Sequence, residues 1–309
     1  GDALLVADGY SGAIVGVTGE GQRKLATVDA GGMVSANRVG GLAIGAGNTF
    51  YATRTGEGQV GAILAFDADG RSTALANVPA SIWQGALAFD AKSQRLYATQ
   101  YLRSRSGAYD GEVVEVDQAT GTCSSVIDGF LHPTGIAALG NVLVVADARR
   151  RALFRIDVAG GRGVFRLQLS AEVERPEAVC ACGDAAVLVT STEDETGLGT
   201  VRRIGLDGSS QILAQGPWEP RGVCCADGIA YVATRVAGSD RASRDPRSPL
   251  PRARRRAPAD RRRHAPSRSD LRGRRSRHCK NSRRARAGAS DRSCCHRTGR
   301  TSWPSGDNE

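Results

Sequence analysis

The sequence predicts an all-β fold: a six-bladed β-propeller with four-stranded antiparallel blades, an incomplete last blade and an Arg-rich tail. Two observations predict it. A unit recurs every 43 to 49 residues, and each unit holds short apolar or alternating segments separated by turn residues. One apolar position marks the copies: Leu42, Leu87, Ile136, Val179 and Val223. Because each blade buries its faces only against neighbouring blades, such an array needs to close into a ring.

Residues 131–169 show the four predicted strands of one blade most clearly. Residues 135–139 form a short apolar segment, and residues 142–146 form a continuous apolar one, as expected of a strand buried on both faces. Residues 152–157 alternate apolar and polar side chains, which is typical of a half-exposed strand. Residues 164–169 supply the fourth strand. Four strands of decreasing burial joined by tight turns describe a propeller blade.

The other blades follow from this template. Residues 4–21 align without a gap with residues 143–160, so the first blade is expected to begin at its second strand. The last blade is expected to stop after its second strand, near Arg235. We assign residues 1–235 to the propeller domain and residues 236–309 to a separate tail. The predicted blades lie near residues 2–28, 39–78, 84–129, 132–171, 176–215 and 220–235.

The tail differs sharply in composition from the domain. It contains 21 Arg and one Lys against seven acidic residues, a net charge of +15, whereas residues 1–235 carry −5. So few apolar side chains cannot offset chain entropy, and the sequence predicts disorder there. One interpretation is an arm that binds nucleic acid phosphates. The other is a shifted reading frame after about Arg235, because the codons of residues 268–275 permit Ala-Arg-Ile-Tyr-Ala-Val-Asp, which matches the third strands of the blades.

Cysteine content and hydropathy bound the cellular setting. The domain has five cysteines, an odd number that does not suggest a disulfide framework and favours a reducing compartment, hence the cytoplasm. Because the chain begins with Gly, a processed N-terminus and an extracytoplasmic setting stay open. No apolar run long enough to cross a membrane is present. A cysteine metal site on residues 180–182 and 224–225 is not favoured, since adjacent residues of a strand face opposite ways.

The candidate site lies where the loops enter the inner strands, because these loops line one mouth of the central channel. Convergent charges in such a hollow are the default ligand site, here for a small polar molecule. We expect Glu177 and His132 to be catalytic residues and Arg221, Thr134, Gln84 and Asp147 to bind substrate. Glu177 and Arg221 are expected to form an ion pair that lowers the pKa of Glu177. Any ligand is then expected to accept a hydrogen bond from Arg221 and to donate one to Glu177.

Five segments carry a family resemblance: HPTGIA at residues 132–137, NVLVVAD at 141–147, LFRIDVAGG at 153–161, PEAVCACGDAAVLV at 176–189 and PRGVCCADGIAYVA at 220–233. They resemble the repeats of NHL-type six-bladed propellers and of the gluconolactonase and senescence-marker-protein superfamily, with strictosidine-synthase-like proteins beside it. The resemblance covers residues 1–235. It implies small-molecule binding with hydrolysis of an ester or lactone. The alternative that it implies is a non-catalytic NHL-type platform that binds a protein or polymer on the same face.

The same resemblance implies a divalent cation, such as calcium, held by a Glu, an Asn and an Asp in lactonase members. In this sequence the Pro-X-Gly or Pro-X-Ala positions hold Thr134, Glu177 and Arg221. Only Glu177 offers a carboxylate, and a single carboxylate does not hold calcium. The sequence therefore predicts no metal ligands and leaves the cofactor unknown.

Overall fold

The computed structural model describes residues 4–9, 11–28, 38–47, 49–55, 61–78, 82–103, 109–159, 162–171 and 173–235. Two compact units divide the chain, residues 1–254 and residues 255–309, and every described residue belongs to the first. The tail predicted to be disordered or to bind nucleic acid lies outside the described residues. Within the described residues, no helix is long and apolar enough to cross a membrane.

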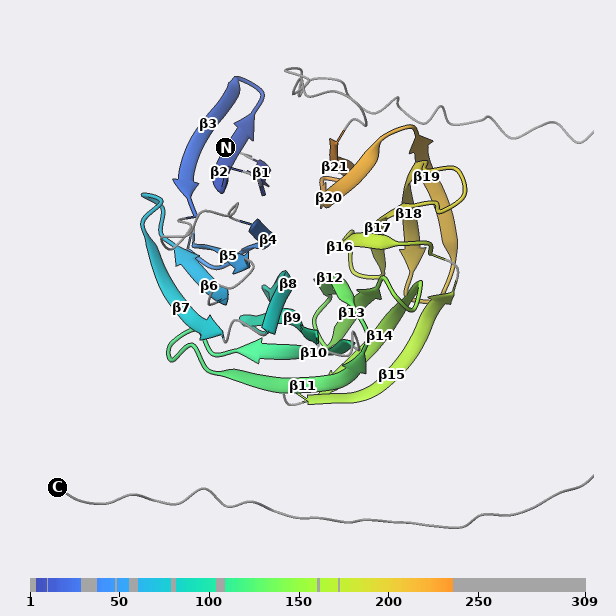
Figure 1. The fold of residues 1–309 in the computed structure, drawn as a ribbon, viewed down its shortest axis with the longest axis horizontal. Coiled ribbons are helices and arrows are strands. Elements are labelled where there is room, and N and C mark those ends of the chain that lie inside the picture. The colour runs from blue at the N-terminus through green and yellow to red at the C-terminus, as the bar shows by residue number, and fades with distance from the viewer. Residues whose placement is uncertain are drawn as a thin grey trace, which may run out of the picture. The chain divides into compact units, whose positions relative to one another are not determined.

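Every regular element of the described residues is a β-strand, and the strands form six antiparallel sheets (Figure 1). The first sheet contains β1 (Leu4–Ala7), β2 (Ala13–Thr18) and β3 (Gly21–Thr27), and the second contains β4 (Arg38–Ile44), β5 (Phe50–Thr55), β6 (Gly61–Phe66) and β7 (Ser72–Val78). The third contains β8 (Ile82–Asp90), β9 (Arg95–Arg103), β10 (Tyr109–Val116) and β11 (Cys123–Phe130), and the fourth β12 (Pro133–Ala138), β13 (Val142–Asp147), β14 (Ala152–Ala159) and β15 (Arg162–Ala171). The fifth contains β16 (Pro176–Ala181), β17 (Ala186–Thr192), β18 (Gly199–Gly205) and β19 (Ser210–Gly216), and the sixth only β20 (Glu219–Ala226) and β21 (Ile229–Arg235).

The sheets surround a common centre, as the sequence predicts for a propeller. In Figure 1 the inner strands β4, β8, β12, β16 and β20 lie nearest the centre, and β7, β11, β15 and β19 lie at the periphery. Each of these inner strands contacts the next one in the series. The predicted all-β fold with four-stranded antiparallel blades is confirmed.

The expected number of six blades is not shown. Four sheets have four strands, the first has three, and β20–β21 is only a hairpin, so the described residues form five blades of three or more strands. The physical reason lies in the sequence after Arg235, where the apolar alternation of the blades ends. Among the described residues, no segment pairs with the outer edge of β21 or the inner edge of β1.

The core lies between neighbouring blades. Tyr97 and Phe130 of the third sheet pack against Ile136 and Phe154 of the fourth, and all four side chains are buried. The second strands carry most of this core, because β17 is buried along its entire length and β13 is buried at every residue after Val142. Because both faces of these strands pack against apolar neighbours, their sequences are continuous apolar runs.

Each inner strand contains a β-bulge at the same place in the blade. In β12, β16 and β20 the register with the second strand skips one residue, which is Thr134, Glu177 or Arg221. A bulged residue is left out of the ladder, and its side chain is aimed independently of the sheet. The predicted site residues Thr134, Glu177 and Arg221 are therefore structurally equivalent positions of three consecutive blades.

In the second and third sheets the equivalent place holds glycine. A Cβ atom at Gly40 would lie 2.7 Å from Thr53 Oγ1, and one at Gly85 would lie 2.5 Å from Thr99 Oγ1. The Thr53 hydroxyl also donates to the Gly85 carbonyl of the next blade at 2.9 Å. Side chains are thus excluded at this position in the early blades and present in the later ones.

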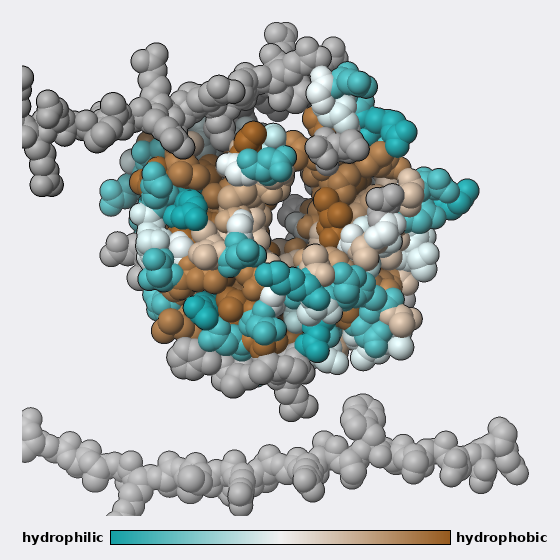
Figure 2. Space-filling view, turned by 180° about the vertical axis from the view of Figure 1, so that it is seen from behind, coloured by the Kyte–Doolittle hydropathy of each residue, from teal (hydrophilic) through white to brown (hydrophobic). Residues whose placement is uncertain are grey.

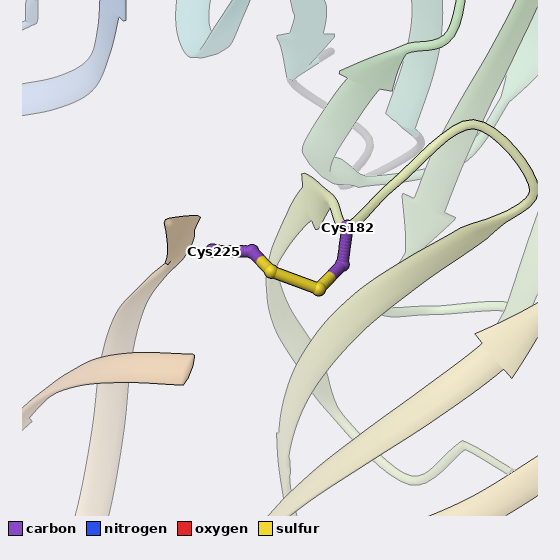
Figure 3. The surroundings of a disulfide bond; sticks show 2 residues. All are labelled: Cys182 and Cys225. Atoms are coloured by element: carbon purple, nitrogen blue, oxygen red, sulfur yellow. A yellow bond between two sulfur atoms is a disulfide. The ribbon is translucent and has the colours of Figure 1, made fainter. Parts of the chain in front are cut away.

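A disulfide joins the fifth and sixth sheets, which corrects the expectation that the domain lacks such bonds. Cys182 follows β16, Cys225 lies in β20, and their sulfur atoms are bonded (Figure 3). The contact of β16 with β20 brings the two Cα atoms within 5.3 Å, a distance typical of disulfides. The sequence around either cysteine does not reveal this pairing, because the pairing depends on how two blades align across their interface.

Candidate functional site

Glu177 and Arg221 lie together at the start of the fifth and sixth sheets, as the sequence predicts. The Arg221 Nη1 atom is 3.7 Å from Glu177 Oε2, and Arg221 Nη2 also donates to Glu219 Oε1. Arg235 is 4.0 Å from the other oxygen of Glu219. The propeller is hollowed at its centre in Figure 2, and the inner strands β16 and β20, which carry Glu177, Glu219 and Arg221, lie beside that centre in Figure 1. The result is a cluster of alternating charges at the inner strands.

The pKa of Glu177 shifts in the direction opposite to the one predicted. Burial is the largest cause and raises this pKa, whereas Arg221 and Arg175 lower it less and Glu219 raises it further. Only a quarter of the Glu177 side chain is exposed, 25%. Desolvation destabilises the charged form of a carboxyl group, and a partly exposed arginine shared with a second carboxylate does not fully compensate. Glu177 is therefore a stronger proton acceptor than an ordinary glutamate.

His132 lies one blade away, against an aromatic pair. The Tyr101 ring meets the His132 ring edge-on with centroids 4.6 Å apart, and Trp83 stacks on Tyr101 at 6.2 Å. Burial lowers the pKa of His132, Asp147 opposes this shift, and Arg149 adds to it. A histidine with a lowered pKa stays neutral at physiological pH and can accept a proton.

Asp147 is a structural anchor of the loop that carries His132. Its fully buried carboxylate accepts the backbone N–H groups of Leu131 at 2.8 Å and His132 at 3.1 Å. It also accepts those of Arg149 and Arg150, both at 3.1 Å. With both oxygens engaged and no exposed surface, Asp147 holds the loop in place, and the direct contact with substrate that the sequence suggested is not available to it.

Gln84 and Thr134 occupy two different settings. Gln84 is 3% exposed and donates from Nε2 to Gln100 Oε1 at 2.7 Å, and Gln100 in turn donates to Glu112 at 2.7 Å. Within the described part of the chain, Gln84 Oε1 has no hydrogen-bond partner. Thr134 donates its hydroxyl to the Pro176 carbonyl at 2.7 Å, directly before Glu177.

The structure thus groups five of the six predicted residues into two sets and leaves Gln84 apart, with Gln100 as its hydrogen-bond partner. Glu177 and Arg221 interact directly, and Thr134 supports the strand start that carries Glu177. His132 and Asp147 form a second set on the fourth sheet. Sequence reasoning missed Tyr101, which pairs with Trp83 across β8 and β9; aligning this hairpin in register would have shown the aromatic pair.

The residues present do not form the cation site that the resemblance implies. Among the described residues, no three His, Cys, Asp or Glu side chains gather closely enough to hold a metal ion. The position of one expected ligand is held by Arg221, whose guanidinium lies 3.7 Å from Glu177. A cation there would be repelled by this guanidinium, so we derive no chemical step through a metal.

Comparison with known proteins supports the fold. No protein family and no curated protein matches the sequence. Among solved structures, a luciferin-regenerating enzyme is similar with a TM-score of 0.58 at 14% identity, over 79% of this chain and 83% of that one. A gluconolactonase from Xanthomonas campestris has a TM-score of 0.57 at 16% identity, over 75% and 78% of the two chains. The calcium-binding protein regucalcin from Agrobacterium tumefaciens has a TM-score of 0.52 at 14% identity, over 76% and 83%.

These likenesses confirm the predicted structural resemblance to gluconolactonase-like propellers. At such low identity they show a common fold, and the chemistry has to be argued from the site.

Proposed function

We propose that this protein binds a small polar molecule at the channel mouth and hydrolyses an ester or lactone bond in it. The observation that carries the proposal is the Glu177–Arg221 pair, a largely buried carboxylate with a raised pKa beside a guanidinium on the adjacent blade. A general base and a hydrogen-bond donor set side by side are the two groups that carbonyl hydrolysis requires. The similar fold of a gluconolactonase supports this reaction class.

Each residue has a distinct role in the proposed reaction. Glu177 accepts a proton from a water molecule, whose oxygen then bonds to the carbonyl carbon. Arg221 donates hydrogen bonds to the carbonyl oxygen as it gains negative charge. When the bond to the leaving oxygen breaks, Glu177 returns its proton to that oxygen, so the carboxylate is regenerated. His132 is the second proton acceptor of this face, and Thr134 holds the strand start beside Glu177.

The test is turnover of a panel of lactones and activated esters by the full chain, with and without a chelator. We expect Glu177→Gln to lower kcat by about 10²- to 10⁴-fold, the usual contribution of a general base. Glu174→Gln is the matched control, because Glu174 is also partly buried but pairs with Arg151 in the preceding loop. Its kcat should stay near that of the wild type.

Two results would overturn the proposal. One is turnover that survives Glu177→Gln. The other is the absence of both turnover and binding across the panel, which would leave the non-catalytic platform as the better account of this face.

A further inference from the structure

The first and last sheets each leave one strand edge open. In the complete blades the second strand is paired on both sides, but β1 pairs only with β2 and β21 only with β20 among the described strands. A row of unpaired backbone N–H and C=O groups on such an edge is a template for another strand. The open ends of the array therefore form a docking surface, which we define as β21 together with β1.

The side chains of this surface are exposed where those of equivalent strands are buried. Ile229 is 54% exposed and Tyr231 is 37% exposed, whereas the equivalent Ala186 and Leu188 of β17 are at most 1% exposed. Val6 of β1 is 37% exposed, and the equivalent Val145 is fully buried. Apolar side chains at positions that the complete blades bury indicate that strands belong beside them.

The complete blades show which strands are missing from the docking surface. By analogy with the complete blades, β21 lacks a third and a fourth strand, and β1 lacks the inner strand of its blade. The third strands share a pattern of two buried apolar residues three positions apart, as in Ile63 and Phe66, Val113 and Val116, and Leu153 and Ile156. Asp67, Asp117 and Asp157 follow these pairs directly. Directly after β6, Asp67 accepts the backbone N–H of Arg71 at 2.9 Å, and directly after β10, Asp117 accepts that of Ala119 at 2.8 Å.

Residues 236–309 as printed do not carry such a pattern, since they contain 21 Arg and seven acidic residues and few large apolar ones. The codons of the same residues read one base later permit it. From the second base of the Asp270 codon, every choice of synonymous codons gives Ile or Thr first. The codons that follow permit Tyr-Ala-Val-Asp, which completes the third-strand pattern.

Two further stretches of the shifted frame are fixed almost regardless of codon usage. From the second base of the His278 codon the frame specifies Ile or Thr, then Val or Ala, then Lys or Arg, then Ile or Thr. From the second base of the Cys294 codon it specifies Val or Ala twice and then Ile or Thr. The β-branched residues among them, Ile, Thr and Val, favour strands. The remaining frame lacks this property, because from the third base of the His278 codon it gives Leu, then Gln or a stop, then Lys or Glu.

The spacing of these stretches is within one residue of that of a blade. Ile63 of β6 precedes the start of β7 by nine residues and precedes Leu87 of the next inner strand by 24. In the shifted frame the stretch at His278 begins eight codons after Asp270, and the stretch at Cys294 begins 24 codons after it. The three stretches thus fall where a third strand, a fourth strand and the next inner strand are required.

We infer that the docking surface is completed by a segment of this gene read one base later than the printed chain, with the frame changing between Arg235 and Asp270. Its first two strands add to β21, and its third lies inside β1 and closes the ring at six blades. The occupant is thus the native continuation of the same polypeptide, and the printed residues 236–309 replace it. This inference is independent of the proposed function.

The test compares the full printed chain with a frame-restored chain made after sequencing the gene from codon 235 onward. We expect slow hydrogen exchange of the β1 and β21 amides only in the restored chain, which should also be monomeric and melt cooperatively at a higher temperature. The amides of β17 serve as the internal control, because they should be protected in both chains. Placing a proline codon where the restored frame begins its third strand should remove the protection of β21 and leave β17 protected.

The inference falls if the gene has no alternative open frame across these codons. It also falls if β21 is already protected in the printed chain, or if frame restoration changes neither exchange nor oligomeric state.

Discussion

At the scale of single residues, burial outweighs a neighbouring guanidinium in setting the pKa of Glu177. The pairing with Arg221 follows from equivalent positions in neighbouring repeats, and the structure contains it at 3.7 Å. The direction of the pKa shift depends instead on how much water reaches the carboxylate, and burial depth at the start of an inner strand leaves no pattern in the sequence. For the same reason the anchoring role of Asp147 was not visible, whereas its place after a strand was.

The raised pKa of Glu177 means that the ionised side chain lowers the stability of the folded protein. Its pKa in the folded protein lies above the ordinary value of 4.5, so the unfolded chain ionises first as pH rises. The penalty is absent below about pH 4.5 and complete above the raised pKa. Glu177→Gln is therefore expected to increase the melting temperature at pH 7.5, and this gain should disappear near pH 4.

Thermal unfolding at the two pH values measures this effect, with Glu174→Gln as the control. A lower melting temperature of Glu177→Gln at pH 7.5 would mean that Arg221 outweighs burial, as the sequence had suggested.

At the scale of strands and loops, the sequence predicted the blades well because their apolar positions recur. In one blade, the continuous apolar run forms β13 and the alternating run forms β14, as predicted. The bulges were not predicted, although in β12, β16 and β20 the bulged residue directly follows a proline near the start of the strand. A bulge is a feature of pairing between two strands, so it appears only once their register is known.

Asp147 offers a test of how one carboxylate holds a loop between two strands. Asp147→Ala leaves four backbone N–H groups without their acceptor, and we expect the free energy of unfolding to fall by about 3 kcal/mol. Asp157→Ala in the same blade is the control, because Asp157 is 44% exposed and pairs with Arg155, so the loss should stay within about 1 kcal/mol. Urea denaturation of both variants gives the comparison. Equal losses would contradict the anchoring role of Asp147.

At the scale of the whole described unit, the Cys182–Cys225 bond ties an incomplete sheet to a complete one. Strand β20 of the hairpin packs against β16, β17 and β18, and the disulfide adds a covalent link to this interface. Neither the repeat pattern nor cysteine counting predicted this bond, because the partners lie 43 residues apart and meet only across a blade interface.

Cys182→Ala tests the importance of this link. Losing a bond that closes a loop of 43 residues is expected to lower the free energy of unfolding by about 2 to 4 kcal/mol. The hairpin should become accessible to protease before the other blades. Thiol labelling provides the readout in the native state, since burial raises the pKa of Cys224 and raises that of Cys180 to about 12, which keeps both as unreactive thiols. Rapid native labelling of the wild type at Cys225 would show that the bond does not form.

The bulge near the start of each inner strand leaves one residue outside the backbone hydrogen bonding that builds the ring. Thr134, Glu177 and Arg221 stand outside the ladder, and their side chains make contacts between neighbouring blades. Gly40 and Gly85, in contrast, are fixed by contacts of 2.7 and 2.5 Å. Duplication of a blade would therefore add both a structural unit and one position outside the ladder, which holds glycine in the second and third sheets and a polar side chain in the next three. A laboratory library randomised at these three codons would measure how far the side chains at this position can change before contacts between the blades are lost.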